Sequence, residues 1–542
     1  MVAADVFFNA EHGYLARPPD YDGVGYMNYA EAPYHLFGEL HIKSAVAHLN
    51  NIAPLWTAVL AVHYLVLGDG PLQAFTTRFW PVALLLVLIY WLVRARAPRS
   101  LAIGAVALTA LLPIVSAGLR SSSWEFFSGR ANYNDDWGLD DLRPDFFAIV
   151  LLMWAIAILA EHNHSLRRSD YLLSAAFAAA AVLMKPSVTP VTFAVWAAAL
   201  AVTWYWNRRL AGTRRLTLLS VGFFAALLLP WAIAGGAYQV LGYLYEVAVT
   251  YKSAYSLTLS LGESLTYYLV RIPAQLGPVE ALLVIAASVL LAVALFRRRL
   301  GRAEAMYAAL VILFYAAFTL TTNKNPHVGE WFTLALWVFV VAGVTRLGSL
   351  SWPAALPRWS PGILAGIGVY TLAVYAAGAV ALFSWPLNEE RADRQLVAVT
   401  NDLARQLRTD LRVGECFTYA PGPGWPASLE ILMTDHDGAA PRSTQIDVDP
   451  SSTTDAYIAN ARKCPAVVVY RENIKQVAKA FFCPPVRQPF LQALSDWVKG
   501  PGSGYRLDRS WRFDDLPPVG PHTLGRYEGV SLTLDLYLRA PE

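Results

Sequence analysis

Two carboxylates near the start of the chain have neighbours that suit proton-transfer chemistry. Asp20 and Asp22 lie in the segment PPDYDGVGYMNYA, beside the aromatic residues Tyr21 and Tyr26. A carboxylate within hydrogen-bond reach of a hydroxyl group can take its proton as that hydroxyl attacks an electrophile. The alternative is that both acids only solvate a loop. The segment therefore predicts a general base, with Asp22 and Asp20 as competing assignments.

A third acid, Asp145, opens an apolar run in the segment LRPDFF. A carboxylate at this position suits the partial positive charge at the N-terminus of a helix. We give equal weight to this structural role and to a role in orienting an acceptor or a base.

Three cations are placed where they could meet a phosphate group. Lys324 and His327 lie in the short segment TNKNPH between two apolar runs, and Arg271 precedes Pro273. Positive side chains near headgroup depth can form charge-assisted hydrogen bonds with a lipid phosphate. Generic headgroup anchoring is the alternative for each of them. We expect the three to bind phosphate as a group, and we interpret Lys185 in MKPS as an interfacial anchor.

The elements that must position these residues are apolar runs long enough to cross a bilayer. At about 20 residues per helix, the sequence predicts about ten spans. Their centres are residues 75–93, 101–119, 146–160, 172–184, 188–206, 216–234, 279–296, 303–320, 331–344 and 363–383.

Charge predicts the orientation of these spans. Arginines gather at alternate ends, at positions 94, 96 and 99; 167 and 168; 208, 209, 214 and 215; 297, 298, 299 and 302; and 346 and 358. These clusters are cytoplasmic by the positive-inside rule. Acidic residues fill the opposite loops, at positions 20, 22, 31 and 39, from 125 to 141, and at 246 and 263. Both the N-terminal segment and the C-terminal region are therefore predicted outside the cytoplasm.

Composition supports this class of protein. The chain has 542 residues, of which 56% are hydrophobic and 15% charged, with a net charge of +3. Such a chain uses the bilayer as its solvent. Its basic residues form no stripe or patch for nucleic acid, so we exclude that class of partner. No group of His, Cys and Asp has metal-ligand spacing, and no metal or other cofactor is assigned, although a divalent ion is left open.

The first 73 residues contain no signal-peptide core and no convincing span. We therefore expect an additional helix upstream of this sequence. Residues 48–73 include an apolar stretch with turn-forming residues, which fits a helix lying in the membrane interface with Trp56 and Tyr64 at headgroup depth.

The composition changes near residue 387 to that of a soluble α/β domain. The sequence predicts a helix over residues 388–408, strands over 415–419 and 465–472, a helix over 473–482, and a final strand over 530–539 from its alternating pattern. Cys416, Cys464 and Cys483 all lie in this region. Outside the cytoplasm one disulfide is expected, with three pairings open.

Several segments in order resemble the C-type glycosyltransferase superfamily, in the group of protein O-mannosyltransferases and bacterial aminoarabinose transferases. These segments are PPDYDGVGYMNYA, APLW, GDGPLQAFTTRFWPV, LRPDFFAIVLLMWAIAILA, AVLMKPS, LLLPWAIAGG and TNKNPHVGEWFTLALWVFVVAG. The resemblance covers residues 17–345 and implies a first extracytoplasmic loop at 1–73, a membrane domain at 74–386 and an extracytoplasmic domain at 387–542.

The resemblance implies a plasma-membrane enzyme that takes sugar from a polyprenyl-phosphate donor and transfers it to a glycan, lipid or protein. It places the catalytic carboxylate, acting as general base, at Asp22. Two departures argue against aminoarabinose as the donor and lipid A as the acceptor. Gly23 follows Asp22 where the family often has a second acid, and Ala53 stands where aminoarabinose transferases carry a phosphate-binding lysine.

Two other functions compete with this interpretation. A transporter would suit about ten spans, but the predicted spans carry few acids and show no repeat. A non-catalytic membrane protein whose outer domain binds a glycan or a partner would require nothing of the first loop.

Overall fold

The computed structural model describes most of the helical region and the core of the C-terminal region. The described residues are 22–49, 51, 53–116, 142–161, 167–245, 259–297, 301–321, 326–351, 365–366, 368–370, 372–374, 376–377, 380, 392–412, 415–419, 442–445, 453–472, 488–516 and 530–540. Asp20, Lys324, Cys483 and the predicted helix over 473–482 lie outside these residues.

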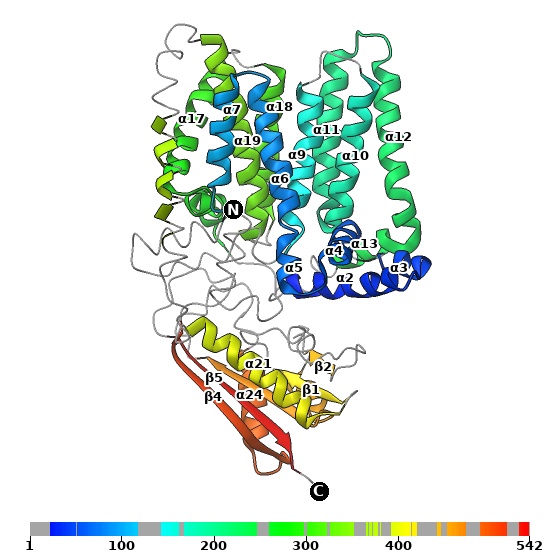
Figure 1. Cartoon of the computed structure of the whole chain (residues 1–542), viewed down its shortest axis with the longest axis vertical. Coiled ribbons are helices and arrows are strands. Elements are labelled where there is room, and N and C mark those ends of the chain that lie inside the picture. Colours follow the sequence, from blue (N-terminus) through cyan, green and yellow to red (C-terminus); the bar gives the residue numbers. More distant parts are fainter. Residues whose placement is uncertain are drawn as a thin grey trace.

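Long helices form one bundle (Figure 1). They are α6 (Phe79–Arg94), α7 (Arg99–Ala110), α9 (Asp145–Glu161), α10 (Arg168–Met184), α11 (Thr189–Asn207), α12 (Thr213–Trp231), α17 (Pro278–Phe296), α18 (Arg302–Leu320) and α19 (Pro326–Ser351). Short elements join them: η2 (Pro186–Val188), η3 (Ala232–Gly236), α13 (Ala237–Tyr245), α15 (Leu261–Thr266), η5 (Leu269–Arg271) and α16 (Ile272–Leu276).

Helix α9 is the centre of the bundle. It packs against α6, α10, α11, α18 and α19. Its residues are apolar on all sides, and from Phe146 to Ala160 all are buried except the half-buried Trp154. A helix that is hydrophobic all round belongs in a core or a membrane. The two ends of α9 therefore carry the polar groups that the bundle must enclose.

Six helical segments of the described chain are long and apolar enough to cross a membrane. They are Leu72–Arg94, Pro186–Asn207, Thr213–Tyr245, Val279–Phe296, Arg302–Leu320 and Gly329–Leu347. Helices α7, α9 and α10 are shorter but pack among them. The helices coincide with nine of the ten predicted spans, while the tenth, at 363–383, is described only in part. The number that cross a bilayer stays a prediction.

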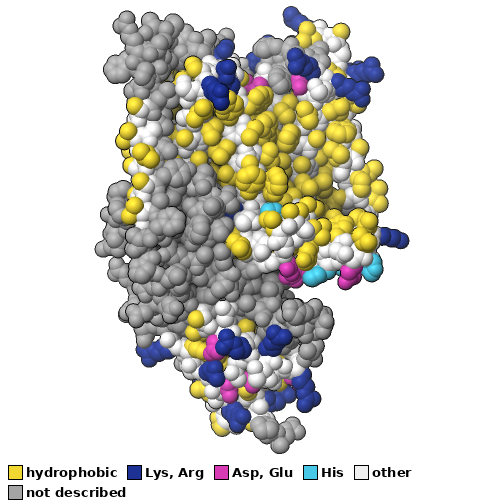
Figure 2. All heavy atoms as spheres, in the orientation of Figure 1, with side chains coloured by type: hydrophobic (Ala, Val, Ile, Leu, Met, Phe, Trp, Pro, Cys, Tyr) yellow, Lys and Arg dark blue, Asp and Glu magenta, His cyan; other side chains and the backbone are white. Residues whose placement is uncertain are grey.

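The two ends of the bundle differ in charge and in cover. Lys and Arg side chains gather at one rim, and hydrophobic side chains cover the helices below it (Figure 2). At the opposite end lie the short helices α2 (Asp22–Gly38), α3 (Ile42–His48), α4 (Pro54–Leu67) and α5 (Pro71–Thr76) (Figure 1). For brevity we call the first end the arginine end and the second the covered end.

The first loop contains more helices than the sequence predicted. The first loop was predicted to contain one helix over residues 48–73, and α4 confirms a short helix there, with Pro54 at its first position. The loop also contains α2, which continues through Pro33. The outer side chains Ile42, Val62 and Val66 are exposed, which is consistent with helices lying in a membrane interface.

The C-terminal region is an α/β domain, as predicted. Its five strands are β1 (Cys416–Tyr419), β2 (Arg442–Gln445), β3 (Ala466–Glu472), β4 (Tyr505–Leu516) and β5 (Val530–Arg539), in the order β2-β1-β3-β5-β4. Strand β1 is parallel to β2 and β3, while β5 is antiparallel to β3 and β4. Helix α21 (Ala392–Asp410) packs on one face, and α24 (Gln488–Lys499) and the end of α23 (Thr454–Ala461) on the other.

A disulfide closes the domain between β1 and the turn before β3. It joins Cys416 to Cys464, whose Cα atoms are 4.9 Å apart. One bond was expected with three pairings open, and this is the pairing that the structure contains.

Candidate functional site

A buried ion pair lies at the covered end of the bundle. Asp145 is the first residue of α9, and Lys185 follows the last residue of α10. The Lys185 Nζ atom is 3.0 Å from the Asp145 Oδ2 atom, and the two side chains are only 13% and 8% exposed. Pro186 disfavours helical geometry at the residue before it, and Lys185 accordingly adopts φ −140° and ψ 80°. Lys185 is therefore a non-helical residue at the end of α10 whose side chain meets the start of α9.

The prediction that Lys185 is an interfacial anchor is therefore wrong. An anchor would extend its ammonium toward the headgroups, whereas this ammonium is enclosed by protein. One sequence signal does mark this residue, because a lysine between Met184 and Pro186 interrupts an otherwise apolar segment. Its partner comes from another helix and is distant in the sequence.

Helix α2 adds a phenol to this ion pair. The Lys185 ammonium donates a hydrogen bond to the Tyr26 hydroxyl oxygen at 3.1 Å and lies 5.6 Å from the centre of the Tyr26 ring. Tyr26 is buried. Tyr26, Asp145 and Lys185, which we call the outer cluster, thus come from three elements.

Helix α4 holds the start of α9 in place beside this cluster. The Trp56 indole N–H donates to the Leu142 carbonyl oxygen at 2.9 Å, and the Trp56 ring packs edge-on against Phe147. Ala53, at the N-cap of α4, is fully buried. The position where aminoarabinose transferases carry a lysine is therefore close to the start of α9 but contributes no charge.

The segment before α9 brings a second cation. Arg143 is only 6% exposed and lies two residues before Asp145. Burying a cation is costly unless an anion or several acceptors compensate it. The described side chains here include two cations, Arg143 and Lys185, and one carboxylate, Asp145. Cations of this kind can form charge-assisted hydrogen bonds with an anionic ligand.

The predicted base is located by its backbone alone. Asp22 is the first residue of α2, one helical turn before Tyr26. Residues four apart lie on the same face of a helix. Asp22 is thus on the face of α2 that carries Tyr26, and Asp22 rather than Asp20 begins this helix.

A second acid on α2 is held in an unusual environment. Burial raises the pKa of the Glu31 carboxyl, and the charge of Asp69 adds to this effect while that of His35 opposes it. The carboxyl is thereby favoured in its neutral form.

Of the three residues predicted to bind phosphate, the structure describes the side chain of one. Arg271 ends η5, where its guanidinium lies 3.7 Å from the centre of the Tyr267 ring and donates to the Tyr267 carbonyl oxygen at 2.6 Å. His327 is in the first turn of α19, and its side chain is outside the described residues, as is the whole of Lys324. Whether the three residues form one group stays a prediction.

The neighbourhood of Arg271 is polar and closely packed. Thr333 on α19 donates a hydrogen bond to the Gln275 side-chain oxygen on α16, and both residues are fully buried. A Cβ atom on Gly329 would lie 2.9 Å from Tyr268 and 3.2 Å from the Gln275 amide nitrogen. Glycine is therefore required for α16 and α19 to approach this closely.

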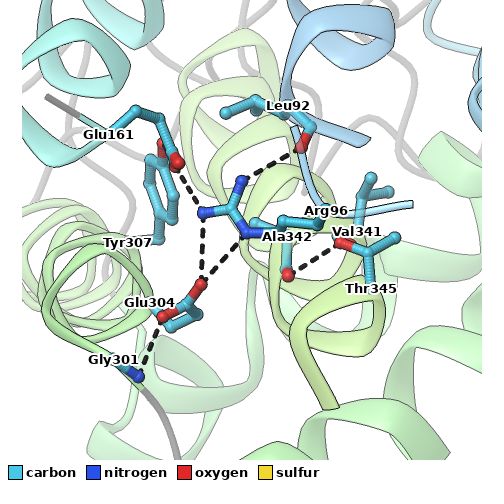
Figure 3. Close-up of polar contacts among 9 residues, drawn as sticks. All are labelled: Leu92, Arg96, Glu161, Gly301, Glu304, Tyr307, Val341, Ala342 and Thr345. Atoms are coloured by element: carbon cyan, nitrogen blue, oxygen red, sulfur yellow. Dashed lines mark hydrogen bonds and ion pairs between the residues drawn. The ribbon is translucent and has the colours of Figure 1, made fainter. Parts of the chain in front are cut away.

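A second buried polar cluster lies at the arginine end of the bundle (Figure 3). The Arg96 guanidinium donates to Glu161 at 2.5 Å and to Glu304 at 3.1 Å, and it also donates to the Leu92 carbonyl oxygen at 3.0 Å. Tyr307 donates to Glu161 at 2.9 Å. We call Arg96, Glu161, Glu304 and Tyr307 the inner cluster. Arg96 was predicted only as one of the cytoplasmic charges, and its partners were not predicted.

The inner cluster ties together the ends of three helices. Arg96 lies in the turn after α6, Glu161 ends α9, and Glu304 is in the first turn of α18, where it also accepts from the Gly301 backbone N–H at 2.9 Å. Its charged side chains are 7%, 12% and 2% exposed. Each charged group has its partners within the protein, which indicates a structural role.

Within the described part of the chain, no group of three or more His, Cys, Asp or Glu residues lies close enough to hold a metal ion.

The fold is that of known glycosyltransferases. Two structures of ArnT from Cupriavidus metallidurans superpose on it, and ArnT is an aminoarabinose transferase of the C-type group. The apo structure has a TM-score of 0.53 at 16% identity and matches 86% of this chain and 91% of ArnT. The structure bound to undecaprenyl phosphate has a TM-score of 0.55 at 15% identity and matches 98% and 96%.

No family model and no curated protein sequence matches the chain. The structural similarity thus confirms the C-type fold suggested by the sequence segments, at identities where only the fold is conserved.

Proposed function

We propose that this protein is a membrane glycosyltransferase that takes sugar from a polyprenyl-phosphate donor and transfers it to an acceptor outside the cytoplasm. The observation that carries the proposal is the outer cluster, in which a buried ammonium is held by a carboxylate and a phenol at the covered end of a C-type fold. A structural cation could be neutralised by carboxylates alone, as Arg96 is. A second buried cation, Arg143, lies two residues before Asp145 in the chain.

The donor phosphate is expected to bind at these cations. Phosphate leaving from the anomeric carbon needs positive charge more than a proton, since it is already a good leaving group. Lys185 and Arg143 can supply this charge, with Arg271, Lys324 and His327 as the further group predicted from the sequence. One of the two similar ArnT structures holds undecaprenyl phosphate, which supports a lipid phosphate as the donor carrier.

The proposed reaction is a displacement at the anomeric carbon. The acceptor hydroxyl oxygen forms a bond to this carbon, and the bond from the carbon to the phosphate oxygen breaks. The hydroxyl proton passes to Asp22, and the bonding electrons leave with the lipid phosphate, whose charge is stabilised by the cations. Asp145 is assigned to holding Lys185 in position, which is the orienting alternative of the sequence analysis.

The proposed location is the plasma membrane, with the arginine end in the cytoplasm. In Figure 1 the C-terminal domain lies at the covered end, away from the arginine end. The Cys416–Cys464 disulfide fits an oxidising compartment,. If the domain is extracytoplasmic, an impermeant maleimide should label reduced Cys416 and Cys464 on intact spheroplasts. Labelling that requires permeabilised membranes would reverse the topology.

The donor sugar and the reaction class can be identified from the polyprenyl-linked sugars of a deletion strain. Loss of the transferase should cause one polyprenyl-linked sugar to accumulate, which mass spectrometry of extracted lipids would detect. Complementation with the wild type or Asp20→Asn should remove this lipid, whereas Asp22→Asn, which preserves size but not basicity, should not.

Each contrary result has a specific meaning. Complementation by Asp22→Asn but not Asp20→Asn would move the base to Asp20. Unchanged lipids in the deletion strain would contradict the enzyme and favour a glycan-binding membrane protein or a transporter.

A further inference from the structure

Two aromatic rings flanked by two cations form a row on the C-terminal domain, away from the outer and inner clusters. The Arg462 guanidinium is 5.6 Å from the centre of the Trp497 ring, and the Arg539 guanidinium is 5.6 Å from that of Tyr505. The two rings meet edge to face, with centres 5.4 Å apart. The order across the surface is therefore Arg462, Trp497, Tyr505 and Arg539.

The fold holds this row rigidly. The Tyr505 hydroxyl donates to the Cys464 carbonyl oxygen, and Arg539 donates to the Arg462 carbonyl oxygen. Cys464 is in turn bonded to Cys416 on β1. The end of α23, the start of β4 and the end of β5 are thus fixed to one another. Trp497 and Tyr505 pack on the small core beneath α24 and are half-buried.

Two further cations are adjacent in sequence to members of the row. Lys463 follows Arg462 and Arg506 follows Tyr505, and both cations are exposed. In the described part of the chain, Arg462, Lys463, Arg506 and Arg539 form no ion pair with a carboxylate. Arg405 and Arg509, by contrast, both lie against Asp402. The four cations thus present positive charge that no carboxylate among the described residues of the domain neutralises.

We propose that Arg462, Lys463, Arg506 and Arg539, with Trp497 and Tyr505, form a binding surface for an anionic saccharide. Guanidinium groups pair with carboxylate or phosphate, and aromatic rings offer apolar faces to sugar rings. The surface is at the end of β5 and beside the C-terminus, which in Figure 1 lies on the side of the domain away from the bundle. Because the surface faces away from the bundle, we expect its ligand to be a polymer in solution and not the lipids of the bilayer.

The inference is independent of the transfer reaction, because binding requires nothing of the outer cluster. It can be tested on the full-length protein in nanodiscs of a zwitterionic lipid. The probes are an oligogalacturonate, which carries carboxylates, a phosphorylated oligomannose, and neutral maltohexaose of similar length. Calorimetric titration should detect at least one of the two anionic probes, with an affinity that falls as salt is raised, and no binding of maltohexaose.

Substitutions then locate the surface. Lys463→Gln with Arg506→Gln removes two exposed charges without touching the contacts that hold the row, and should weaken binding about tenfold. The matched control is Arg408→Gln with Arg412→Gln, which removes two exposed charges near the end of α21, the helix on the other sheet face. This control should change the affinity by less than about twofold.

Three results would overturn the inference. They are equal losses in the two double variants, binding of maltohexaose as tight as that of the anionic probes, and binding of neither anionic probe by the wild type. Capture of anionic phosphatidylglycerol vesicles in the absence of saccharide binding would assign the surface to a membrane instead. Trp497→Phe, which keeps an apolar ring on the core, should weaken saccharide binding without lowering the thermal stability of the domain.

Discussion

The two buried polar clusters at opposite ends of α9 use similar residue types in different ways. At the arginine end, one guanidinium meets two carboxylates and a helix carbonyl, and a tyrosine donates to one of those carboxylates. At the covered end, one ammonium meets one carboxylate, and a tyrosine accepts its hydrogen bond. The inner cluster has an excess of anions, while at the covered end a further buried cation, Arg143, lies two residues before Asp145.

This difference distinguishes a charge cluster that joins helices from the proposed phosphate-binding site. The inner cluster binds helix ends together and leaves its guanidinium fully occupied. The outer cluster lies where the non-helical residue after α10, Lys185, and the start of α9 meet helix α2. A ligand phosphate can add a further anion there, whereas the inner cluster would repel it. The same central helix thus carries a structural group at one end and the proposed site at the other.

The largest expected effect is on stability at the inner cluster. Arg96→Met should lower the free energy of unfolding by about 3 to 5 kcal/mol, because it leaves two carboxylates buried without their cation. Thermal unfolding in detergent would show this as a large fall in Tm. The double variant Arg96→Met with Glu304→Gln should recover part of the loss. A Tm near that of the wild type for Arg96→Met would contradict a structural role.

The next effect is on catalysis at the outer cluster. Lys185→Met should reduce turnover about 100- to 1000-fold, which is the loss expected when one donor to a developing anion is removed. The measurement is the rate of polyprenyl-linked sugar consumption by protein in nanodiscs.

Loss of Lys185 also leaves Asp145 buried without its partner, so a second variant must separate folding from function. Lys185→Met with Asp145→Asn removes both charges and should recover the Tm but not the rate. Recovery of the rate would show that Lys185 serves only to neutralise Asp145.

Two tyrosines provide a smaller and closely matched comparison. Tyr26→Phe removes an acceptor from the Lys185 ammonium, and a hydrogen bond to a charged group contributes about 1.5 to 3 kcal/mol. The transfer rate should therefore fall about tenfold or more. Tyr307→Phe removes a hydroxyl from the inner cluster and should lower the Tm while leaving the rate of the folded protein unchanged. Equal effects of both variants on the rate would remove the distinction between the clusters.

The smallest effect concerns pH and the covering helix. Burial raises the pKa of Glu31, so the fold favours its neutral form. The stability that this form provides is complete below the ordinary Glu pKa, about 4.3, and is lost as pH rises through the raised value. Glu31→Gln should flatten this part of the profile of Tm against pH. The control Glu39→Gln removes an exposed acid and should leave the profile unchanged. A flat wild-type profile would contradict the assignment.

Local patterns predicted much of the fold. The alternating residues of 530–539 and the apolar run of 465–472 correspond to β5 and β3, and most of the predicted spans correspond to bundle helices. Strand β4 was not predicted, because YRLDRSWRFDDL carries charges on both faces at the edge of the sheet. Helix α2 was not predicted either, since Gly23, Gly25 and Pro33 are residues that weaken helices.

Site residues could be predicted only where their own local sequence marked them. Asp145 was singled out from its place at the start of an apolar helix, and the structure gives it a buried partner. The roles of Lys185 and Arg96 depend on contacts between helices that are distant in the sequence, and Arg96 meets Glu304 across 208 residues. Periodicity and composition carry no information about such contacts.

If the outer cluster holds the phosphate of a lipid-linked sugar, the protein should also bind the polyprenyl phosphate carrier alone. This binding can be measured without knowledge of the sugar. Native mass spectrometry of the full-length protein released from nanodiscs would measure retained undecaprenyl phosphate. We expect one bound lipid for the wild type and for Tyr307→Phe, and loss of this lipid for Lys185→Met with Asp145→Asn. No retained lipid on the wild type, or equal retention by all three proteins, would contradict it.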